Sequence, residues 1–378
     1  MIICYNIMKP SSGPPSVVRN LLNGFMKIAN LIHKRGVEIT FLSLYENVET
    51  IKVDDNVQIR GLPVVKPITL TLELRSLLKR VGRFDVVHTH VLHYVPRYAL
   101  GRTPTIYTMH GVIWNEIRYY TELYLKIPQI LLLLRFKMYL PLLTKLVLIS
   151  PYLVDELKEY GINLPTSKIE LIENPVSDQY FNLVKKEDHV ILYPARFFPQ
   201  KNQLAFIKAL SLVKNDIKEY KVIFTLGSYY DSKYLTYAKN YVKKKNLGNV
   251  EFTRCSLKDM INLYSRASFV ALTSLQETLP MSVLEAMSSG TPVLVSNIKP
   301  MRYIVEDGVT GLLVDPSNPR DIAEKILLLV NDGNLRKKVG SNAKRVAEKR
   351  WRSEVIAEKH LKLYEEIAEE SDKHVQLS

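Results

Sequence analysis

Two glutamates, Glu277 and Glu285, lie eight residues apart in the stretch ETLPMSVLEAMSSGTP. Pro280 lies between them, at a position that suits the first turn of a helix because the missing proline N–H costs nothing there. Glu277 would then lie in the loop before the helix, and Glu285 about two turns along it on roughly the same side. Such a pair could bind hydroxyl groups at both ends of one elongated ligand.

The start of this helix offers a site for an anion between the two carboxylates. The first N–H groups of a helix have no partner within it, so those of Met281, Ser282 and Val283 can hold a phosphate. The residues on both sides of Glu285 are apolar, which favours a place at the edge of a cleft over a solvated helix face. Hydroxyl groups at each end and an anionic middle describe a nucleotide sugar.

Two basic residues come after another candidate strand, in the segment HVILYPARFFPQKN. Arg196 and Lys201 lie five residues apart around a turn that leads into a helix. A guanidinium and an ammonium group at the end of a strand and beside a helix start suit a diphosphate. A surface salt bridge is the alternative for either residue taken alone.

Two segments of the first half also follow candidate strands. His110, beside Gly111 and after TPTIYTM, could reach a substrate hydroxyl or stabilise a developing charge. A structural histidine of the core is the alternative. In KPSSGPPS, Gly13 precedes two prolines that can open a helix, whose N-terminus would bind an anion. This segment matches neither GxGxxG nor GxxxxGK[ST], so it favours neither a hydride-transfer enzyme nor a P-loop NTPase.

Other histidines and the cysteines give no metal signature. His88, His90 and His93 in VVHTHVLH have a spacing that resembles a metal site, but alternate residues of a strand simply share one face. We therefore interpret them as core histidines. Cys4 and Cys255 are far apart in the chain and are expected to be unpaired thiols of a reducing compartment.

The elements that must position these residues are short strands alternating with helices. Apolar runs rich in β-branched residues recur from MIICYNIM to KLVLIS, and again from HVILYPAR to TPVLVSN. Such alternation predicts parallel sheets with right-handed crossover helices. In doubly wound sheets ligands bind beyond the carboxyl ends of the strands, which is where the candidate residues stand.

A polar, turn-rich segment at residues 174–188 separates the two series of strands. We therefore expect two doubly wound α/β domains, an N-terminal one over residues 1–180 and a C-terminal one over residues 181–350. A charged helical tail over residues 351–378 is expected to pack back toward the N-terminal domain.

The charge of the chain is strongly basic. Its net charge is +14, and residues 60–145 hold 13 Lys/Arg against 4 Asp/Glu, which favours phosphates, nucleic acid or an anionic membrane as a partner. Residues 124–150 are apolar and basic without an acid, but Pro128 and Pro141 interrupt them. No apolar run reaches the ~18 residues of a membrane span. Residues 127–143 are therefore either a buried helix or a contact with an anionic membrane surface.

The N-terminal residues lack the basic start, apolar run and small-residue cleavage site of a signal peptide. We therefore expect a cytoplasmic protein. The basic, apolar segment at residues 124–150 suggests that it also associates with the inner face of the cell membrane.

Residues 277–326, ETLPMSVLEAMSSGTPVLVSNIKPMRYIVEDGVTGLLVDPSNPRDIAEKI, resemble the signature of the retaining family 4 glycosyltransferases of the GT-B fold. YPARFFPQKN resembles that family's donor-phosphate motif, and TMHG, KLVLISPYLVDELKEYG and LIENPVS occur in the expected order. The resemblance spans nearly the whole chain and is specific in the C-terminal half. It implies two Rossmann-like domains facing across a cleft. The second domain would bind most of a nucleotide-diphosphate sugar, and the acceptor would enter from the first.

The resemblance also implies roles for the cations and for Glu285. Arg196 and Lys201 would neutralise the leaving diphosphate, and Glu285 would hold the ribose hydroxyls. The chain has no Asp-x-Asp motif, which fits a donor neutralised by these cations. We therefore expect neither a metal nor another cofactor.

On the sugar side, the resemblance implies that Glu277 holds sugar hydroxyls, with the backbone of Thr278 and Leu279 alongside. His110 would face the sugar near its anomeric carbon. Catalysis would stabilise the leaving group around an oxocarbenium-like state, so positioning and electrostatics would set the rate. No enzyme nucleophile is needed.

The resemblance is incomplete at the loops. The family's usual double glycine after the first strand is reduced to Gly13, and Thr278 and Pro280 replace more usual residues after the first glutamate. Gly227 remains in FTLGSYYD, where the nucleotide is usually held, while FTRCSLKD departs from the pattern. The identity of the base is therefore open.

These arguments give two sets of candidate residues. The expected catalytic residues are His110, Glu277, Arg196 and Lys201. The expected donor-binding residues are Gly13, Arg196, Lys201, Gly227, Glu277, Thr278, Leu279, Met281, Ser282, Val283 and Glu285.

The favoured function is transfer of a sugar from a nucleotide-diphosphate sugar to a glycan, lipid-linked or polysaccharide acceptor. One alternative is a sugar-nucleotide epimerase or hydrolase of the same architecture. Another is a non-catalytic protein that binds nucleotide sugars, or nucleic acid, which would explain the positive charge. Basic and aromatic residues are not interleaved in a recognisable nucleic-acid motif, so no nucleic-acid partner is expected.

Overall fold

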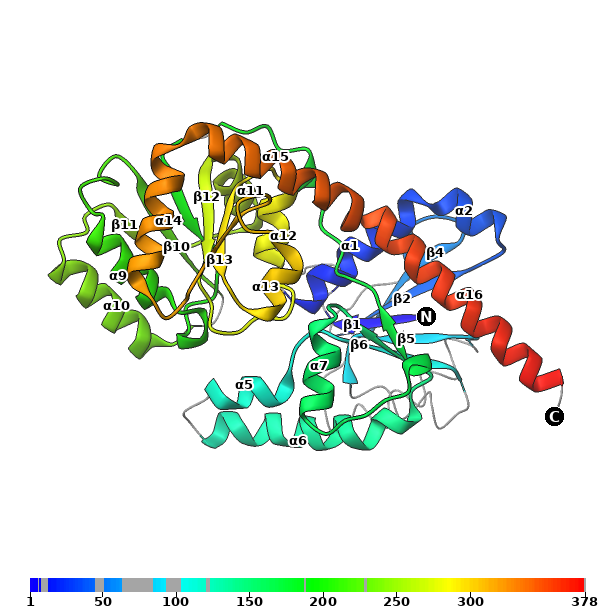
Figure 1. Cartoon of the computed structure of the whole chain (residues 1–378). Coiled ribbons are helices and arrows are strands. Elements are labelled where there is room, and N and C mark those ends of the chain that lie inside the picture. The colour runs from blue at the N-terminus through cyan, green and yellow to red at the C-terminus, as the bar shows by residue number, and fades with distance from the viewer. Residues whose placement is uncertain are drawn as a thin grey trace. The chain divides into compact units, whose positions relative to one another are not determined.

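The computed structural model describes residues 1–5, 7, 13–44, 51–62, 84–92, 103–119, 123–186, 188–227 and 230–376. Contacts within the chain divide it into two compact units. Unit 1 is Met1–Pro175 together with Ser353–Ser378, and unit 2 is Val176–Arg352 (Figure 1). Each unit is built of helices around a mainly parallel sheet, so the expected class of two Rossmann-like α/β domains is confirmed.

The sheet of unit 1 has the strand order β3-β4-β2-β1-β5-β6-β7-β8 over the described residues. Its strands are β1 (Ile2–Tyr5), β2 (Ile39–Leu44), β3 (Ile51–Lys52), β4 (Val57–Leu62), β5 (Val87–Thr89), β6 (Thr105–Met109), β7 (Lys145–Leu148) and β8 (Ile169–Leu171). The pairings are parallel except that of β3 with β4. The connection from Lys52 to Val57 is too short for a crossover, so it can form only an antiparallel hairpin.

The helices of unit 1 include one from the far end of the sequence. They are α1 (Pro14–Lys27), α2 (Ala29–Lys34), α5 (Ile113–Tyr119), α6 (Leu123–Tyr139), α7 (Tyr152–Glu159) and α16 (Ser353–Gln376), with the short 3₁₀-helices η2 (Leu140–Leu142) and η3 (Thr166–Lys168). Helix α6 continues through Pro128, so the interruption expected at that proline is wrong. Pro128 lies in the first turns of α6, where it removes one backbone hydrogen bond.

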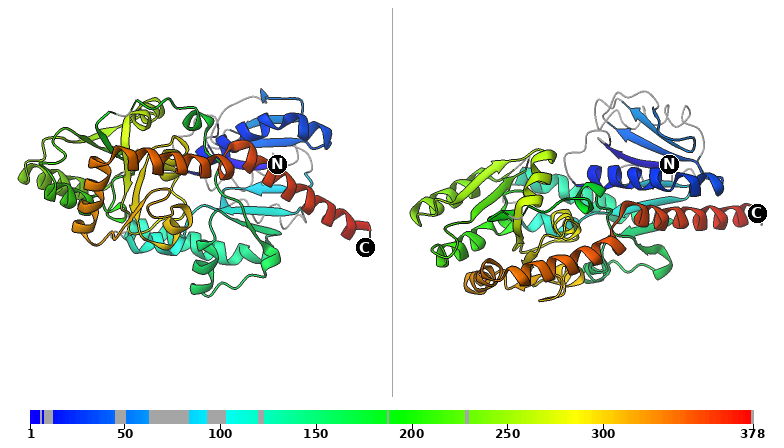
Figure 2. Two further views of the ribbon diagram at one scale, coloured as in Figure 1. Left: turned by 45° about the horizontal axis from the view of Figure 1, so that its top comes forward. Right: turned by 90° about the horizontal axis from the view of Figure 1, so that it is seen from above.

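Helix α16 packs along α1 and completes the core of unit 1 (Figure 2). Its buried residues Ile356 and Leu361 lie in one cluster with Phe25 and Phe41. The two helices approach so closely that a Cβ on Gly24 would lie 2.1 Å from the carbonyl oxygen of Ser353. The helical tail is therefore a structural part of unit 1.

The sheet of unit 2 is parallel throughout, with the order β11-β10-β9-β12-β13-β14. Its strands are β9 (Val190–Tyr193), β10 (Lys221–Leu226), β11 (Val250–Arg254), β12 (Ala267–Leu272), β13 (Val293–Ser296) and β14 (Leu312–Val314). Its helices are α8 (Asp178–Phe181), η4 (Pro199–Lys201), α9 (Gln203–Leu212), α10 (Ser232–Lys244), α11 (Leu257–Arg266), α12 (Met281–Ser288), α13 (Lys299–Ile304), α14 (Pro319–Asn331) and α15 (Gly333–Arg350).

The two central strands of unit 2, β9 and β12, are neighbours, and every residue in them is buried. Continuous apolar strands of this kind are typical of a parallel sheet covered on both faces. Because the strands are parallel, their carboxyl ends meet at one edge of the sheet. The loops that follow β9 and β12 are therefore held side by side.

Candidate active site

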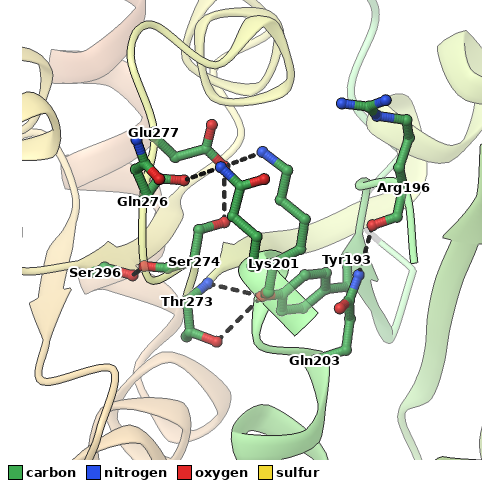
Figure 3. Close-up of polar contacts among 10 residues, drawn as sticks. Tyr193, Arg196, Lys201, Gln203, Thr273, Ser274, Gln276, Glu277 and Ser296 are labelled. Atoms are coloured by element: carbon green, nitrogen blue, oxygen red, sulfur yellow. Dashed lines mark hydrogen bonds and ion pairs between the residues drawn. The ribbon is translucent and has the colours of Figure 1, made fainter. Parts of the chain in front are cut away.

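Lys201 and Glu277 form an ion pair at this edge of the unit 2 sheet. Lys201 ends η4, after β9, and Glu277 lies in the loop between β12 and α12. The Lys201 Nζ and the Glu277 Oε1 are 2.6 Å apart, and the side chains are 16% and 7% exposed. The Ser274 hydroxyl donates to the same oxygen at 2.7 Å, as Figure 3 shows. The pair therefore has fixed positions in a nearly dry environment.

Tyr193 joins the two loops that carry this pair. Its hydroxyl donates to the Lys201 carbonyl oxygen at 2.5 Å and accepts from the Thr273 N–H at 2.9 Å (Figure 3). Burial raises the pKa of Tyr193, so the phenol stays protonated. The backbone N–H of Leu275 donates to the Gln200 carbonyl oxygen at 2.9 Å, which adds a direct link between the loops.

Asn202 fixes the turn that presents Lys201. Its φ of 54° lies in the left-handed region, where asparagine is among the few residues besides glycine that occur often. Its side-chain amide donates to the carbonyl oxygens of Thr273 and Pro316, at 2.9 and 2.8 Å. The sequence HVILYPARFFPQKN thus contains both the cation and the residue that orients it.

Arg196 lies apart from the Lys201–Glu277 pair, against the end of β10. The backbone of Arg196 accepts a hydrogen bond from Gln203 at 2.8 Å, and its exposed guanidinium lies over the Phe198 ring. A Cβ on Gly227 would lie 2.5 Å from the Cγ of Arg196, so a glycine is what leaves room for this side chain. Figure 3 shows the guanidinium separate from the pair, with no hydrogen bond or ion pair drawn between them. The structure brings Arg196 together with Gly227, and Lys201 together with Glu277.

The start of α12 provides two free amides. The N–H groups of Val283 and Leu284 donate to the Pro280 carbonyl oxygen, at 3.0 and 3.3 Å. Over the described residues no hydrogen bond is made by the N–H of Met281 or Ser282. The expected anion site therefore has the amides of Met281 and Ser282, while that of Val283 is already used. Thr278 and the buried Leu279 lie in the loop just before them.

Glu285 lies about one turn further along α12 and faces two tyrosines. The Tyr264 hydroxyl donates to its carboxylate at 3.0 Å, and Tyr180 forms a second side-chain hydrogen bond with it. The two rings meet edge to face, with centroids 5.3 Å apart. Burial raises the pKa of Glu285 to about 7, although both phenols lower it. Sequence reasoning missed Tyr180 and Tyr264, because both occur in apolar helical patterns that look like ordinary core.

His110, in unit 1, ends a stack of imidazole rings. Its Nε2 lies 2.8 Å from the Nδ1 of His90, and the ring centroids are 5.1 Å apart. His88 follows at 4.6 Å from His90, and His360 of α16 at 5.3 Å from His88. No group of side chains able to hold a metal ion occurs in the described part of the chain. His93 lies outside the described residues.

The N-terminus of α1 differs from the expectation for KPSSGPPS. Residues 8–12 lie outside the described residues, and Gly13 has a φ of 67° and is exposed. Pro14 and Pro15 have no N–H, while those of Ser16 and Val17 both donate to the Gly13 carbonyl oxygen. The expected free amides are therefore absent from the first four residues of α1. If Gly13 binds the donor, it must do so through its own backbone groups.

Helix α6 of unit 1 has an apolar surface on its outer side. Its exposed side chains recur at helical spacing: Ile127, Ile130, Leu131, Leu134 and Met138, each 42–61% exposed. On its other side α6 buries Leu133 and Phe136. The helix contains basic residues and no acid. Of the helices that the structure describes, none combines the length and apolarity needed to cross a bilayer.

Comparison with known proteins gives matches along nearly the whole chain. Residues 178–346 match the family model of glycosyl transferases group 1, and residues 24–180 match that of glycosyltransferase family 4. An uncharacterised glycosyltransferase of Methanocaldococcus jannaschii is 28% identical over 94% of this chain and 98% of its own. A UDP-Gal:alpha-D-GlcNAc-diphosphoundecaprenol alpha-1,3-galactosyltransferase of Escherichia coli is 24% identical over 72% of this chain and 73% of its own.

The fold is shared with solved structures. That of sucrose-phosphate synthase from Thermosynechococcus elongatus aligns with a TM-score of 0.73 at 19% identity, over 97% of this chain and 98% of the other. At this identity the likeness concerns the fold alone. The two family matches together span residues 24–346, so they include most of unit 2 and a large part of unit 1.

Proposed function

Since this chain belongs to the glycosyl transferases group 1 family, we propose that it moves a sugar from a nucleotide-diphosphate sugar to a lipid-linked glycan, with retention and without a metal ion. That it is a glycosyltransferase follows from the family. The observation that carries the finer proposal is the Lys201–Glu277 ion pair beside the free amides of Met281 and Ser282. It offers a cation and N–H donors next to a carboxylate, as a donor of this class requires.

The positive charges are suited to a leaving diphosphate. When the bond between the anomeric carbon and the phosphate oxygen breaks, its electron pair stays with the diphosphate. Lys201, Arg196 and the α12 amides can stabilise that charge, and fixed donors do so with little reorganisation. These groups supply the positive charge that a metal would otherwise provide, which supports metal-independent transfer.

The two carboxylates have different roles in this proposal. Glu277 is held through Oε1 by Lys201 and Ser274, and its other oxygen would accept sugar hydroxyls. Glu285 is oriented by Tyr264 and Tyr180 and would accept the ribose hydroxyls. His110 would face the sugar from unit 1.

A lipid-linked acceptor is favoured by the outer surface of α6. Its exposed apolar side chains with basic neighbours and no acid suit a helix that lies in the interface of an anionic bilayer. The Escherichia coli relative is named for an acceptor carried on diphosphoundecaprenol. We therefore propose that α6 contacts the membrane that carries the acceptor.

The donor site is tested by the shift in melting temperature that UDP, GDP, ADP and their sugar conjugates cause, with EDTA present. We expect one nucleotide to raise the melting temperature of the wild type and to have little effect on Lys201→Ala and Glu285→Ala. Lys208→Ala removes an exposed lysine of the neighbouring α9 and should respond as the wild type does. A requirement for Mg²⁺, or equal shifts in all three variants, would contradict the proposed site.

The reaction is tested with the nucleotide sugar so identified and a synthetic lipid-diphosphate glycan. NMR of the product should show the anomeric configuration of the donor. Release of free sugar alone, at the same rate with and without acceptor, would instead support the hydrolase alternative.

The membrane surface is tested by flotation with vesicles of phosphatidylglycerol at low salt. We expect binding by the wild type and loss of binding by Leu131→Glu/Leu134→Glu. The matched control, Leu257→Glu/Leu328→Glu, changes two exposed leucines of unit 2 and should still float. Equal behaviour of the two double variants, or no binding by the wild type, would exclude α6 as the contact.

A further inference from the structure

Beyond the donor site, one face of the unit 1 sheet carries a stack of four imidazoles. The rings occur in the order His360, His88, His90, His110, with centroids 5.3, 4.6 and 5.1 Å apart. His88 in β5 and His90, the first residue after that strand, are two residues apart and stack on one another. Helix α16 places His360 against His88. The stack runs from this helix to the half-buried His110.

Hydrogen bonds fix two neighbouring rings of the stack, His88 and His360. His88 contacts the Tyr364 hydroxyl through Nδ1, at 2.7 Å, and the Thr108 hydroxyl through Nε2, at 2.6 Å. The Nδ1 of His360 donates to the Ile356 carbonyl oxygen at 3.0 Å. His90 therefore packs against a neighbour whose orientation is set on both sides of its ring.

One hydrogen bond links the rings of His90 and His110. The His90 Nδ1 and the His110 Nε2 are 2.8 Å apart, so one of them must be the donor when both rings are neutral. If His110 were the donor, His90 would carry its own proton on Nε2. That nitrogen is fully buried and has no hydrogen-bond partner among the residues that the structure describes.

A buried N–H without an acceptor costs more than a lone pair without a donor, since orphaned buried N–H groups are the rarer of the two in proteins. The lower-energy arrangement therefore has the proton on the His90 Nδ1, which donates to the His110 Nε2. The proton of His110 is then on its Nδ1. Nδ1 has no hydrogen-bond partner among the described residues, and His110 is half-buried.

Both rings stay neutral in this environment. Burial lowers the pKa of His110 to about 4, with a further contribution from His360. Burial and the neighbouring His88, His110 and His360 also lower the pKa of His90. A positive charge on any ring would repel a charge on the next, so the stack as a whole resists protonation.

We propose that His90 is a positioning residue that holds His110 in its Nδ1–H tautomer, so that His110 offers the sugar a neutral N–H donor and has no free lone pair to act as a base. The part of this inference that concerns the sugar rests on the proposed function. A neutral donor can bind a sugar hydroxyl without opposing the positive charge that develops at the anomeric carbon. An imidazolium at the same place would oppose it.

The tautomer is tested by ¹⁵N NMR on the full chain labelled selectively at histidine, with His110 assigned through His110→Gln. We expect Nδ1 of His110 to have the shift of a protonated, pyrrole-type nitrogen and Nε2 that of an unprotonated, pyridine-type nitrogen. The reverse pattern in the wild type would overturn the inference. This measurement needs no substrate, so it determines the tautomer of His110 even if no sugar transfer is found.

Variants of His90 test whether it sets the tautomer. His90→Phe keeps a stacked ring but has no donor, and it should shift His110 toward the Nε2–H form and lower kcat on the order of 10-fold or more. His90→Asn places an amide N–H near the former Nδ1 and should restore the Nδ1–H pattern and most of kcat. His33→Gln removes an exposed histidine and should leave the His110 signals unchanged. An unaltered His110 pattern in His90→Phe would refute the role of His90.

Discussion

The two glutamates of the donor site are equivalent in the sequence motif but have opposite surroundings. Glu277 is paired with an ammonium group 2.6 Å away. Among the described residues, Glu285 forms side-chain hydrogen bonds with two phenols, and burial raises its pKa to about 7. Near neutral pH, Glu285 therefore exchanges a proton, while Glu277 is fixed in place by its ion pair with Lys201.

The raised pKa of Glu285 predicts a stability that falls as pH rises. The folded state keeps the proton to about pH 7, whereas the unfolded chain loses it near the ordinary value of 4.5. The stabilisation is therefore complete below about pH 4.5 and is lost between pH 4.5 and 7. Glu285→Gln, which keeps an acceptor for the tyrosines, should be about 2–3 kcal/mol more stable than the wild type at pH 8. The two should be nearly equal at pH 4.

Urea denaturation at both pH values checks this prediction. Glu358→Gln, at an exposed position of α16, is the control and should differ little from the wild type at either pH. A gain for Glu285→Gln that is the same at pH 4 and pH 8 would show that the effect is not ionisation of Glu285.

The ion pair predicts a strong coupling between Lys201 and Glu277. Removing one partner leaves the other charge nearly buried, so Lys201→Met or Glu277→Gln alone should destabilise the protein by about 2–4 kcal/mol. The double variant should lose much less than the sum of the two. A double-mutant cycle in urea measures this coupling energy, and additive losses would mean that the pair contributes nothing to stability.

Much of this residue-level picture follows from the sequence. Residues that follow adjacent parallel strands are expected at one sheet edge, which is why Lys201 and Glu277 could be assigned to one site. Their direct pairing could not, because the pattern does not say which cation faces which acid. Tyr180 and Tyr264 could not be found either, since they reach Glu285 from two other helices, α8 and α11.

At the scale of elements, the end of β10 decides where Arg196 lies. Gly227→Ala would place a Cβ 2.5 Å from the Arg196 Cγ, near the base of that side chain, so the arginine must move. We expect nucleotide affinity to fall about 10-fold, which is a loss of about 1.4 kcal/mol of binding free energy. Calorimetric titration with the nucleotide measures it.

Gly248→Ala is the matched control for this substitution. A Cβ at Gly248 would meet no atom within 4 Å, so the variant should bind as the wild type does. Unchanged affinity in Gly227→Ala would mean that Arg196 does not contact the donor.

The order of strands and helices could be predicted because apolar runs, turn residues and helical patterns alternate so regularly. The exceptions have local causes. The strand β3 is antiparallel because its connection is short, and the amides at the start of α1 are used because its first residues are prolines and the next two bond to Gly13. The sequence did not tell whether the outer apolar residues of α6 are buried or exposed, since a run of leucines fits a buried helix as well as an exposed one.

At the scale of the whole molecule, the close packing of α16 on α1 joins the two ends of the sequence in one unit. Gly24→Val would force a side chain into the carbonyl group of Ser353, 2.1 Å from the Cβ position. Overpacking of this kind lowers the free energy of unfolding by about 1–3 kcal/mol or more. Here the loss should concern unit 1, which contains both helices. We expect Gly24→Val to lower the protease resistance of unit 1 peptides while those of unit 2 are unchanged.

Met26→Val is the control for this experiment. It introduces the same β-branched residue on the exposed side of α1, where Met26 is 45% exposed. Equal sensitivity of the two variants would point to helix propensity and not to the contact with α16.

The return of the chain to unit 1 also has a consequence for biosynthesis. A ribosome releases residues in order, yet the core of unit 1 includes Ile356, Leu361 and Ile367. The first unit to emerge therefore lacks part of its core until α16 has been made. Unit 2 is continuous from Val176 to Arg352, so it can fold first although it is translated second. The nascent N-terminal half would then stay incompletely folded, and open to chaperones, until the ribosome has passed unit 2 and made α16.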